Sequence, residues 1–286
     1  MTVPFKDLQA KGTKSAGSCV FQCLTHYGKL FILILSGISF TGCDMQNNML
    51  YYPDSRLPSG SELTAKDLQF WPAGPTGYRG YISTGGIKDI KGTIIVFHGN
   101  AGTAADRDYY LSAMGSMSYR VILAEYPGYG GRKGELSEQS FVNDSRETLR
   151  IVAETFKGPI YLLGESLGCG VVAGVAKETS LNIAGIILIT PWNTLLAVAK
   201  DHYPYLPVGW FMKDRYDNTE NLNSFQGKIA VVGAERDEVV PVRHAEALFT
   251  LLPGDKRMWI IKGAGHNDWP MLIDMSKWQE IMDFLS

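Results

Sequence analysis

The expected fold is decided by one stretch of nine residues, Ile160-Tyr161-Leu162-Leu163-Gly164-Glu165-Ser166-Leu167-Gly168. Its first half is apolar throughout, as in a strand that is covered on both faces. Its second half matches the pattern G-x-S-x-G, and small apolar residues continue it as a helix to about residue 174. Glycines are needed around a serine at such a turn, because the strained backbone crowds its neighbours. The stretch predicts that Ser166 is a nucleophile; the alternative is a glycine-rich turn with an incidental serine.

Strand-like and helix-like segments alternate along the rest of the chain. We expect strands at 78–83, 93–97, 120–125, 160–164, 185–190, 229–233 and 258–262. Helical patterns lie between them at 103–117, 138–156, 167–179, 242–252 and 271–285. This alternation favours an α/β fold with a mostly parallel central sheet flanked by helices on both faces. Ligands bind at the carboxyl ends of the strands in such folds, so the chemistry is expected there.

A nucleophilic serine needs a base to remove its proton and an acid to orient that base. When the serine lies on a strand-to-helix turn, the acid and then the histidine follow it along the chain. His266 fits this order because it lies in a loop just after the last expected strand. His244 belongs to a helical pattern and is expected to face solvent. We therefore predict His266 as the base.

The acid is expected in the loop after the strand at 229–233, which offers Glu235, Asp237 and Glu238. Asp237 is favoured because it lies midway between that strand and Pro241, where a carboxylate can reach an imidazole. Glu235 and Glu238 are interpreted as ordinary loop charges.

The transition state of acyl transfer carries an oxyanion that backbone N–H groups stabilise. One donor is the residue after the nucleophile, Leu167, and the other comes from the loop after an early strand. In this chain that loop is His98-Gly99-Asn100-Ala101-Gly102, which leaves Asn100 or Ala101 as the second donor. His98 is interpreted as a structural residue, and no ligands with metal-binding spacing lie near it, so no metal or cofactor is expected.

Taken together, these segments resemble the α/β-hydrolase superfamily, and within it the Bem46-like serine hydrolases. The resemblance spans about residues 49–286 and rests on five motifs in the correct order: 98–102, Glu125-Tyr126-Pro127-Gly128-Tyr129-Gly130, 164–168, 235–241 and Gly265-His266-Asn267-Asp268. It implies an α/β-hydrolase fold and a Ser-His-Asp mechanism. The chain departs from the pattern at Gly131-Arg132, where relatives place a residue and then serine.

About 36 residues lie between Thr190-Pro191-Trp192 and the strand that begins at 229. We interpret 193–228 as a short cap insert, the region from which hydrolases of this kind usually build their substrate pocket. Aromatic side chains at its entrance and within it are candidate pocket residues, namely Trp192, Tyr203, Trp210 and Phe211. The alternative is that they pack the cap onto the sheet.

The composition excludes other classes of function. Lys and Arg number 27 against 29 Asp and Glu, a net charge of −2, which gives no electrostatic basis for binding nucleic acid. The glycines at 128, 130, 131 and 134 do not match the register of a dinucleotide-binding loop, because position 133 is lysine.

The first 42 residues have the pattern of an export signal. Residues 1–29 carry four lysines and one aspartate, and an apolar run follows at 30–40. As a helix this run rises about 16 Å, too short to span a bilayer. Cys43 follows Gly42 as in a bacterial lipobox, so we expect a lipoprotein signal at 1–42 and a lipid on Cys43. A plain cleaved signal or a short N-terminal anchor is the alternative.

This interpretation divides the chain into a signal at 1–42, a polar tether at 43–67 and a hydrolase domain at 68–286. The mature protein is expected on the periplasmic side of a bacterial membrane, and Asp44 favours the inner membrane. Cys19 and Cys23 leave with the signal, so Cys169 has no disulfide partner. Cys169 is expected to pack within its helix.

The sequence thus predicts a serine hydrolase that cleaves carboxylic esters or thioesters, with lipid-like esters among its substrates and no cofactor. A peptidase or amidase with the same triad is one alternative. A membrane-tethered binding module on a hydrolase scaffold is the other. The acyl chain, the leaving group and the oligomeric state are not fixed by the sequence.

Overall fold

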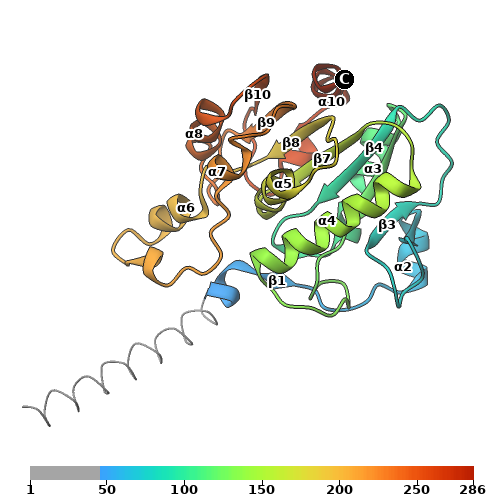
Figure 1. Cartoon of the computed structure of the whole chain (residues 1–286), viewed down its shortest axis with the longest axis horizontal. Helices are drawn as coiled ribbons and strands as arrows, with labels where there is room; N and C mark the ends of the chain where they lie inside the picture. Colours follow the sequence, from blue (N-terminus) through green and yellow to red (C-terminus); the bar gives the residue numbers. More distant parts are fainter. Residues whose placement is uncertain (1–45) are drawn as a thin grey trace, which may run out of the picture. The chain divides into compact units, whose positions relative to one another are not determined.

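The computed structural model describes residues 46–286, which form one unit with its own core (Figure 1). The predicted signal at 1–42 and Cys43 lie outside the described residues. Strands in this unit are β1 (Tyr52–Pro53), β2 (Leu68–Trp71), β3 (Gly80–Ser83), β4 (Gly92–Phe97), β5 (Ala101–Gly102), β6 (Tyr119–Ala124), β7 (Ile160–Glu165), β8 (Gly185–Ile189), β9 (Lys228–Ala234) and β10 (Lys256–Ile261). Helices are α2 (Gly60–Ala65), α3 (Tyr109–Gly115), α4 (Glu138–Thr155), α5 (Leu167–Glu178), α6 (Leu195–His202), α7 (Asn218–Leu222), α8 (Arg243–Leu251), α9 (Trp269–Leu272) and α10 (Met275–Leu285), with 3-10 turns η1 (Ala104–Arg107) and η2 (Val208–Trp210).

Eight strands form the central sheet in the order β10-β9-β8-β7-β4-β6-β3-β2. The six strands from β10 to β6 run parallel, whereas β3 pairs antiparallel with both β6 and β2. All six residues of β4 and all five of β8 are buried, as expected for apolar strands covered on both faces. The predicted α/β-hydrolase architecture is confirmed.

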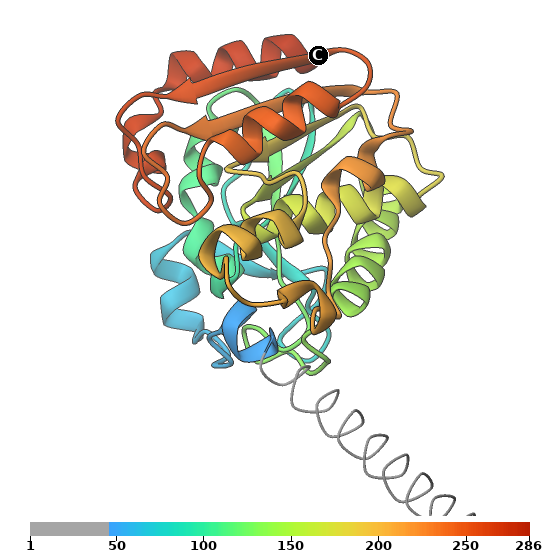
Figure 2. The same cartoon turned by 90° about the vertical axis from the view of Figure 1, so that its left-hand side faces the viewer.

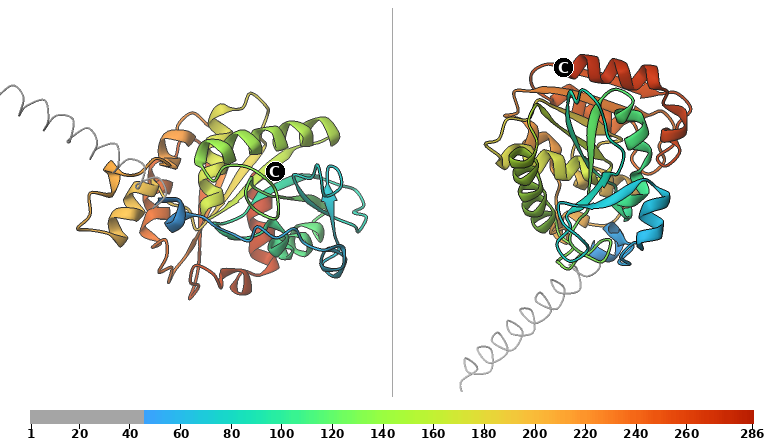
Figure 3. Two further views of the ribbon diagram at one scale, coloured as in Figure 1. Left: turned by 90° about the horizontal axis from the view of Figure 1, so that it is seen from below. Right: turned by 90° about the vertical axis from the view of Figure 1, so that its right-hand side faces the viewer.

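Helices cover both faces of this sheet and create two apolar cores (Figure 3). One core contains Leu149 of α4, Val171 of α5 and Leu248 of α8. The other contains Met114 of α3 and Ile281 of α10. Burial on both faces holds the central strands rigidly, and their carboxyl ends are therefore fixed points from which loops can present side chains.

The prediction of a polar tether over 43–67 is wrong for the described part of that segment. Tyr51 is only 4% exposed, and its hydroxyl donates to Asp214 over 2.7 Å. β1 pairs with β5 beside the predicted oxyanion loop, and Leu63 of α2 is buried in the core. The segment has few apolar residues, but Tyr51 and Leu63 are buried against the domain, so the polar composition misled the prediction.

The departure at Gly131-Arg132 has a structural explanation. The Arg132 guanidinium reaches the Glu125 carbonyl and forms an ion pair with Asp144 of α4, with Nη1 2.7 Å from the Asp144 carboxylate. Arg79 from the loop before β3 pairs with the same carboxylate, also over 2.7 Å. Arg132 therefore ties the loop after β6 to α4, a contact that a serine is too short to make.

Candidate active site

Ser166 stands on a sharp turn between β7 and α5. Its φ of +52° and ψ of −112° lie outside the regions that ordinary residues occupy. A Cβ on Gly168 would lie 1.9 Å from the Phe97 carbonyl oxygen, and one on Gly164 would lie 2.5 Å from the Gly168 carbonyl oxygen. Only glycine fits at these two positions, because strand β4 passes directly against Gly168 and the first turn of α5 lies directly against Gly164. The strain holds the Ser166 hydroxyl out at the end of the strand.

The structure brings the three predicted side chains into one hydrogen-bonded chain. The distance from Ser166 Oγ to His266 Nε2 is 3.0 Å, and from His266 Nδ1 to Asp237 Oδ2 it is 2.7 Å. They come from the segments that follow the parallel strands β7, β9 and β10; β10 neighbours β9, and β8 lies between β9 and β7. A carboxylate only accepts hydrogen bonds, so Nδ1 carries the proton and the lone pair on Nε2 faces the serine hydroxyl.

The Asp237 carboxylate is fixed on its other side by the backbone. Its Oδ1 accepts the N–H groups of Val239 over 2.9 Å and Val240 over 2.7 Å. Asp237 is buried, and the His266 side chain is only 11% exposed. Three accepted hydrogen bonds leave the carboxylate one orientation, with Oδ2 toward His266. Ser166 is 8% exposed, so solvent still touches the nucleophile.

The neighbouring acids stay outside this arrangement. Glu235 is exposed and bonds to Lys262 and to the Gly263 N–H, and the Lys262 ammonium holds the pKa of this carboxyl below its usual value. Glu238 is exposed as well. Both therefore match their interpretation as loop charges.

The prediction that His244 faces solvent is wrong. It is 6% exposed, with Nε2 2.5 Å from Asp201 and Nδ1 3.2 Å from the Asn193 side-chain oxygen. Its helix α8 turns His244, Ala245 and Leu248 toward the interior. His244 therefore joins α8 to α6.

The predicted oxyanion loop lies directly beside the nucleophile. A Cβ on Gly99 would lie 3.7 Å from the Ser166 Cβ. The next peptide group carries the Asn100 N–H, and the Asn100 carbonyl accepts the Tyr52 N–H over 2.9 Å and the Tyr129 hydroxyl over 2.7 Å. Leu167 is the first residue of α5, so its N–H has no partner within the helix. Ala101 starts β5 and is exposed.

Sequence reasoning missed how this loop is held. His98 is buried, with Nδ1 2.7 Å from the Gly99 carbonyl and Nε2 3.0 Å from Glu125 Oε1. Glu125 is also buried and accepts the Ala104 N–H over 3.0 Å. Because His98 fixes the Gly99 carbonyl, it also fixes the N–H of the same peptide group, which belongs to Asn100. The signal was present in the motif that begins at Glu125, but the sequence gives no hint that Glu125 meets His98.

The comparisons with known proteins agree with this fold. Residues 92–226 match the family model described as alpha/beta hydrolase fold. The uncharacterized protein Rv2307c of Mycobacterium tuberculosis is 30% identical, over 85% of this chain and 87% of its own length. The chain belongs to the alpha/beta hydrolase family.

Further relatives of this hydrolase carry names that indicate hydrolytic activity. Lysophosphatidylserine lipase ABHD12 of Danio rerio is 28% identical, over 58% of this chain and 48% of that protein. Among solved structures, the esterase Pf2001 of Pyrococcus furiosus matches with a TM-score of 0.60 at 14% identity, over 82% of this chain and 96% of the other. A monoacylglycerol lipase of Paleococcus ferrophilus matches with a TM-score of 0.52 at 16% identity, over 70% and 96%. At these identities the structures show the fold alone.

The four aromatic residues predicted to line the hydrolase's pocket do not gather around one cavity. Trp192 belongs to the buried core, where its indole N–H donates to the Tyr216 carbonyl over 3.0 Å. Trp210 is 86% exposed, so the pocket interpretation is wrong for both tryptophans. Tyr203 is 39% exposed and Phe211 is half-buried. Two surface hollows of about 390 and 260 Å³ lie elsewhere, lined mainly by 156–160 and by residues of α4, α5 and the insert.

Residues 46–286 of the hydrolase contain neither a metal-ligand cluster nor a helix that could span a membrane. No cluster of three or more His, Cys, Asp or Glu side chains in this range has an arrangement that could hold a metal ion. Within the same range, every helix is too short or too polar to cross a bilayer.

Cys169 is buried and its thiol donates to the Gly164 and Ile189 carbonyls. Burial raises the pKa of this thiol well above its usual value, which makes it unreactive.

Proposed function

We propose that this hydrolase cleaves carboxylic esters or thioesters through a covalent acyl-enzyme on Ser166. The observation that carries the proposal is the continuous hydrogen-bonded chain from Ser166 Oγ through His266 to Asp237. Its direction matters: the lone pair of Nε2 faces the hydroxyl, so His266 can accept the serine proton as the oxygen attacks.

In this mechanism each group has one task. Ser166 Oγ attacks the substrate carbonyl carbon while its proton moves to His266 Nε2. The buried Asp237 carboxylate stabilises the positive charge that then forms on the imidazole. The negative charge on the substrate oxygen meets the Leu167 N–H and the N–H of Asn100 or Ala101, at the positive end of the α5 dipole. His266 returns the proton to the leaving group, and water repeats the sequence to release the acid.

Lipid-like esters are the substrate class that we favour. One relative bears the name lysophosphatidylserine lipase, which describes action on a lipid ester. The subfamily that we favour is the Bem46-like branch, on the motifs given above.

We also propose that the mature protein is exported and held at the periplasmic side of a bacterial membrane by a lipid on Cys43. The basic and apolar pattern of 1–40 followed by Gly42-Cys43 supports this. Labelling with radioactive palmitate tests it: we expect incorporation in the wild type and none in Cys43→Ser. An unprocessed cytosolic chain would refute it.

Labelling with a fluorophosphonate probe tests the nucleophile, and a panel of substrates tests the reaction. We expect the probe to label the wild type and Ser112→Ala, a variant at an exposed serine of α3, but not Ser166→Ala. We expect hydrolysis of p-nitrophenyl butyrate to be lost in Ser166→Ala alone. Faster cleavage of matched amides than of esters would make the protein an amidase. Absence of labelling in the wild type would instead favour a binding module.

A further inference from the structure

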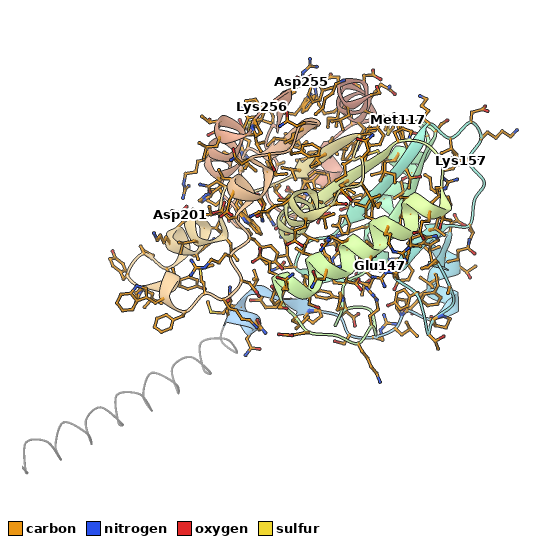
Figure 4. All side chains as sticks on the ribbon, viewed as in Figure 1. Met117, Glu147, Lys157, Asp201, Asp255 and Lys256 are labelled. Atoms are coloured by element: carbon orange, nitrogen blue, oxygen red, sulfur yellow. The ribbon has the colours of Figure 1, made fainter. Side chains whose placement is uncertain are left out.

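The cap insert carries an exposed apolar segment that the proposed chemistry does not use. Residues 203–212 read Tyr-Pro-Tyr-Leu-Pro-Val-Gly-Trp-Phe-Met, without a charged side chain, and none of the ten is buried. Tyr205 is 97% exposed, Trp210 86% and Leu206 59%. We call residues 203–212 the aromatic tip. Figure 4 shows ring side chains that point outward from this loop, beyond α6 with its labelled Asp201.

The aromatic tip is an ordered structure. Its backbone forms a series of tight turns, in which the Leu206 N–H donates to Tyr203, the Trp210 N–H to Pro207 and the Phe211 N–H to Val208. The prolines fix their own φ angles and stiffen the loop. The fold therefore presents these apolar side chains to the solvent in a defined arrangement, which is the mark of an interaction surface.

We propose that the aromatic tip is a surface that seats on a lipid bilayer. Tyrosine and tryptophan combine an apolar ring with a polar group, and for this reason they collect at the interface between acyl chains and headgroups. The exposed cations Lys200, Lys213 and Arg215 flank the tip. The Lys213 ammonium lies 3.4 Å from the Glu135 carboxylate, whereas Lys200 and Arg215 can meet anionic headgroups. The nearby acids are occupied: Asp201 pairs with Arg243 and His244, and Asp214 is buried.

The start of the described chain lies at the same place. The Gln46 side chain accepts the backbone N–H groups of Lys213 and Asp214 and donates to the Asp214 carbonyl, over 2.7, 3.1 and 2.8 Å. Figure 2 shows the helical turn at 46–50 in blue beside the orange loop of the insert. Cys43 is three residues before Gln46, and three residues span at most about 11 Å. A lipid on Cys43 would therefore hold the membrane next to the aromatic tip.

The base of the insert is joined to the loop that carries Asp237. His202, the last residue of α6, lies with Nε2 2.8 Å from the Val239 carbonyl. The Val239 N–H in turn donates to Asp237. A tip seated on the bilayer would thus keep the acid loop of the candidate site close to the membrane surface, from which a lipid-like ester could reach Ser166. The contact itself does not require that Ser166 be catalytic.

Tryptophan fluorescence tests this placement selectively. The chain has six tryptophans, and the five other than Trp210 are each at most 8% exposed. We would reconstitute the full chain in vesicles of phosphatidylcholine and phosphatidylglycerol, with and without brominated acyl chains, which quench tryptophans that touch them. The difference in emission between the wild type and Trp210→Phe is the contribution of Trp210. We expect brominated lipid to remove most of this contribution.

A matched variant moves the reporter to another exposed site. Leu251 at the end of α8 is 57% exposed, close to the 59% of Leu206. In the double variant Trp210→Phe with Leu251→Trp, we expect no quenching by brominated lipid. Leu206→Ser should weaken the quenching of Trp210, and Leu251→Ser should leave it unchanged. Circular dichroism checks that each variant is folded.

Three results would overturn the proposal. The first is equal emission of the wild type in brominated and ordinary vesicles. The second is equal quenching of the tryptophans at 210 and 251, which would mean unspecific adsorption. The third is a dimer in detergent, measured by light scattering, that Leu206→Ser dissociates while Trp210 stays unquenched, which would assign the tip to a second copy. Loss of esterase activity in any of these chains bears on the proposed function alone.

Discussion

Replacing Asp237 with asparagine is the sharpest test of how the candidate site works. The two side chains have nearly the same shape. The substitution therefore changes little besides removing a charge and turning one hydrogen-bond acceptor into a donor. Asp237 only accepts hydrogen bonds in the structure: two from the N–H groups of Val239 and Val240, and one from His266 Nδ1. An asparagine cannot satisfy all three.

Either orientation of the new amide has a defined cost. If its oxygen faces Val239 and Val240, its NH₂ group faces His266 Nδ1. The imidazole must then carry its proton on Nε2, which leaves no lone pair for the Ser166 hydroxyl. If the amide is flipped, its NH₂ group faces the two backbone N–H groups, and those buried donors lose their acceptor.

The magnitude follows from these two states. Loss of general base catalysis lowers a rate about 10²–10⁴-fold, and loss of the charge that stabilises the imidazolium adds to it. The flipped orientation leaves the Val239 and Val240 N–H groups without an acceptor, which costs about 1–3 kcal/mol. The first orientation therefore dominates. We expect kcat of Asp237→Asn to fall at least about 10³-fold, which corresponds to about 4 kcal/mol of barrier.

The assay is hydrolysis of p-nitrophenyl butyrate under saturating conditions, with urea unfolding as a check on the fold. Glu238→Gln is the matched control, because it makes the same chemical change one residue away on an exposed side chain. We expect it to keep the wild-type rate. The reasoning fails if Asp237→Asn keeps more than about a tenth of kcat, or if Glu238→Gln falls equally far.

The oxyanion loop, the turn and the buried tyrosines give further tests. His98→Ala removes one of the hydrogen-bond partners of the buried Glu125 carboxylate, so urea unfolding should show a loss of about 1–3 kcal/mol, and kcat should fall more than KM rises. Gly168→Ala should lose more than about 3 kcal/mol, since its Cβ overlaps a β4 carbonyl, whereas Gly74→Ala, with open space around it, should unfold at the wild-type urea midpoint. Burial raises the pKa of Tyr78 to about 12, so the folded state prefers the neutral phenol. The free energy of unfolding of the wild type should be unchanged below pH 10 and fall as the pH rises toward 12. Over the same pH range the urea midpoint of Tyr78→Phe should fall less than that of the wild type.

Much of the fold could be predicted because its signals are local. Strands such as β4 and β8 are apolar at every position and are buried at every position. β2 was missed because it is a short strand at the edge of the sheet, with an exposed Gln69 in its middle. Local composition carries little information about a strand that has one neighbour and one open side.

The errors in the N-terminal segment have a different origin. The contacts that fold it are made across the whole chain: the Tyr51 hydroxyl meets Asp214, 163 residues later, and Tyr52 meets the oxyanion loop at Asn100. A polar, proline-containing stretch resembles a tether in sequence whether or not the domain offers it partners. Only the folded arrangement of distant segments distinguishes the two cases.

Two His–Asp pairs in the described part of the chain show what the sequence alone cannot reveal about a site. His266 with Asp237 and His244 with Asp201 both have ring nitrogen to carboxylate distances of 2.5–2.7 Å. The difference is at the second ring nitrogen, which faces the Ser166 hydroxyl in the first pair and the Asn193 side-chain oxygen in the second. A hydroxyl has a proton to give and an amide oxygen has none, so only His266 can act as a base toward its neighbour. Chain order selected the histidine that lies against Ser166, but it rests on a rule about the fold. The physical reason lies in what the second ring nitrogen touches, and no pattern in the sequence expresses that.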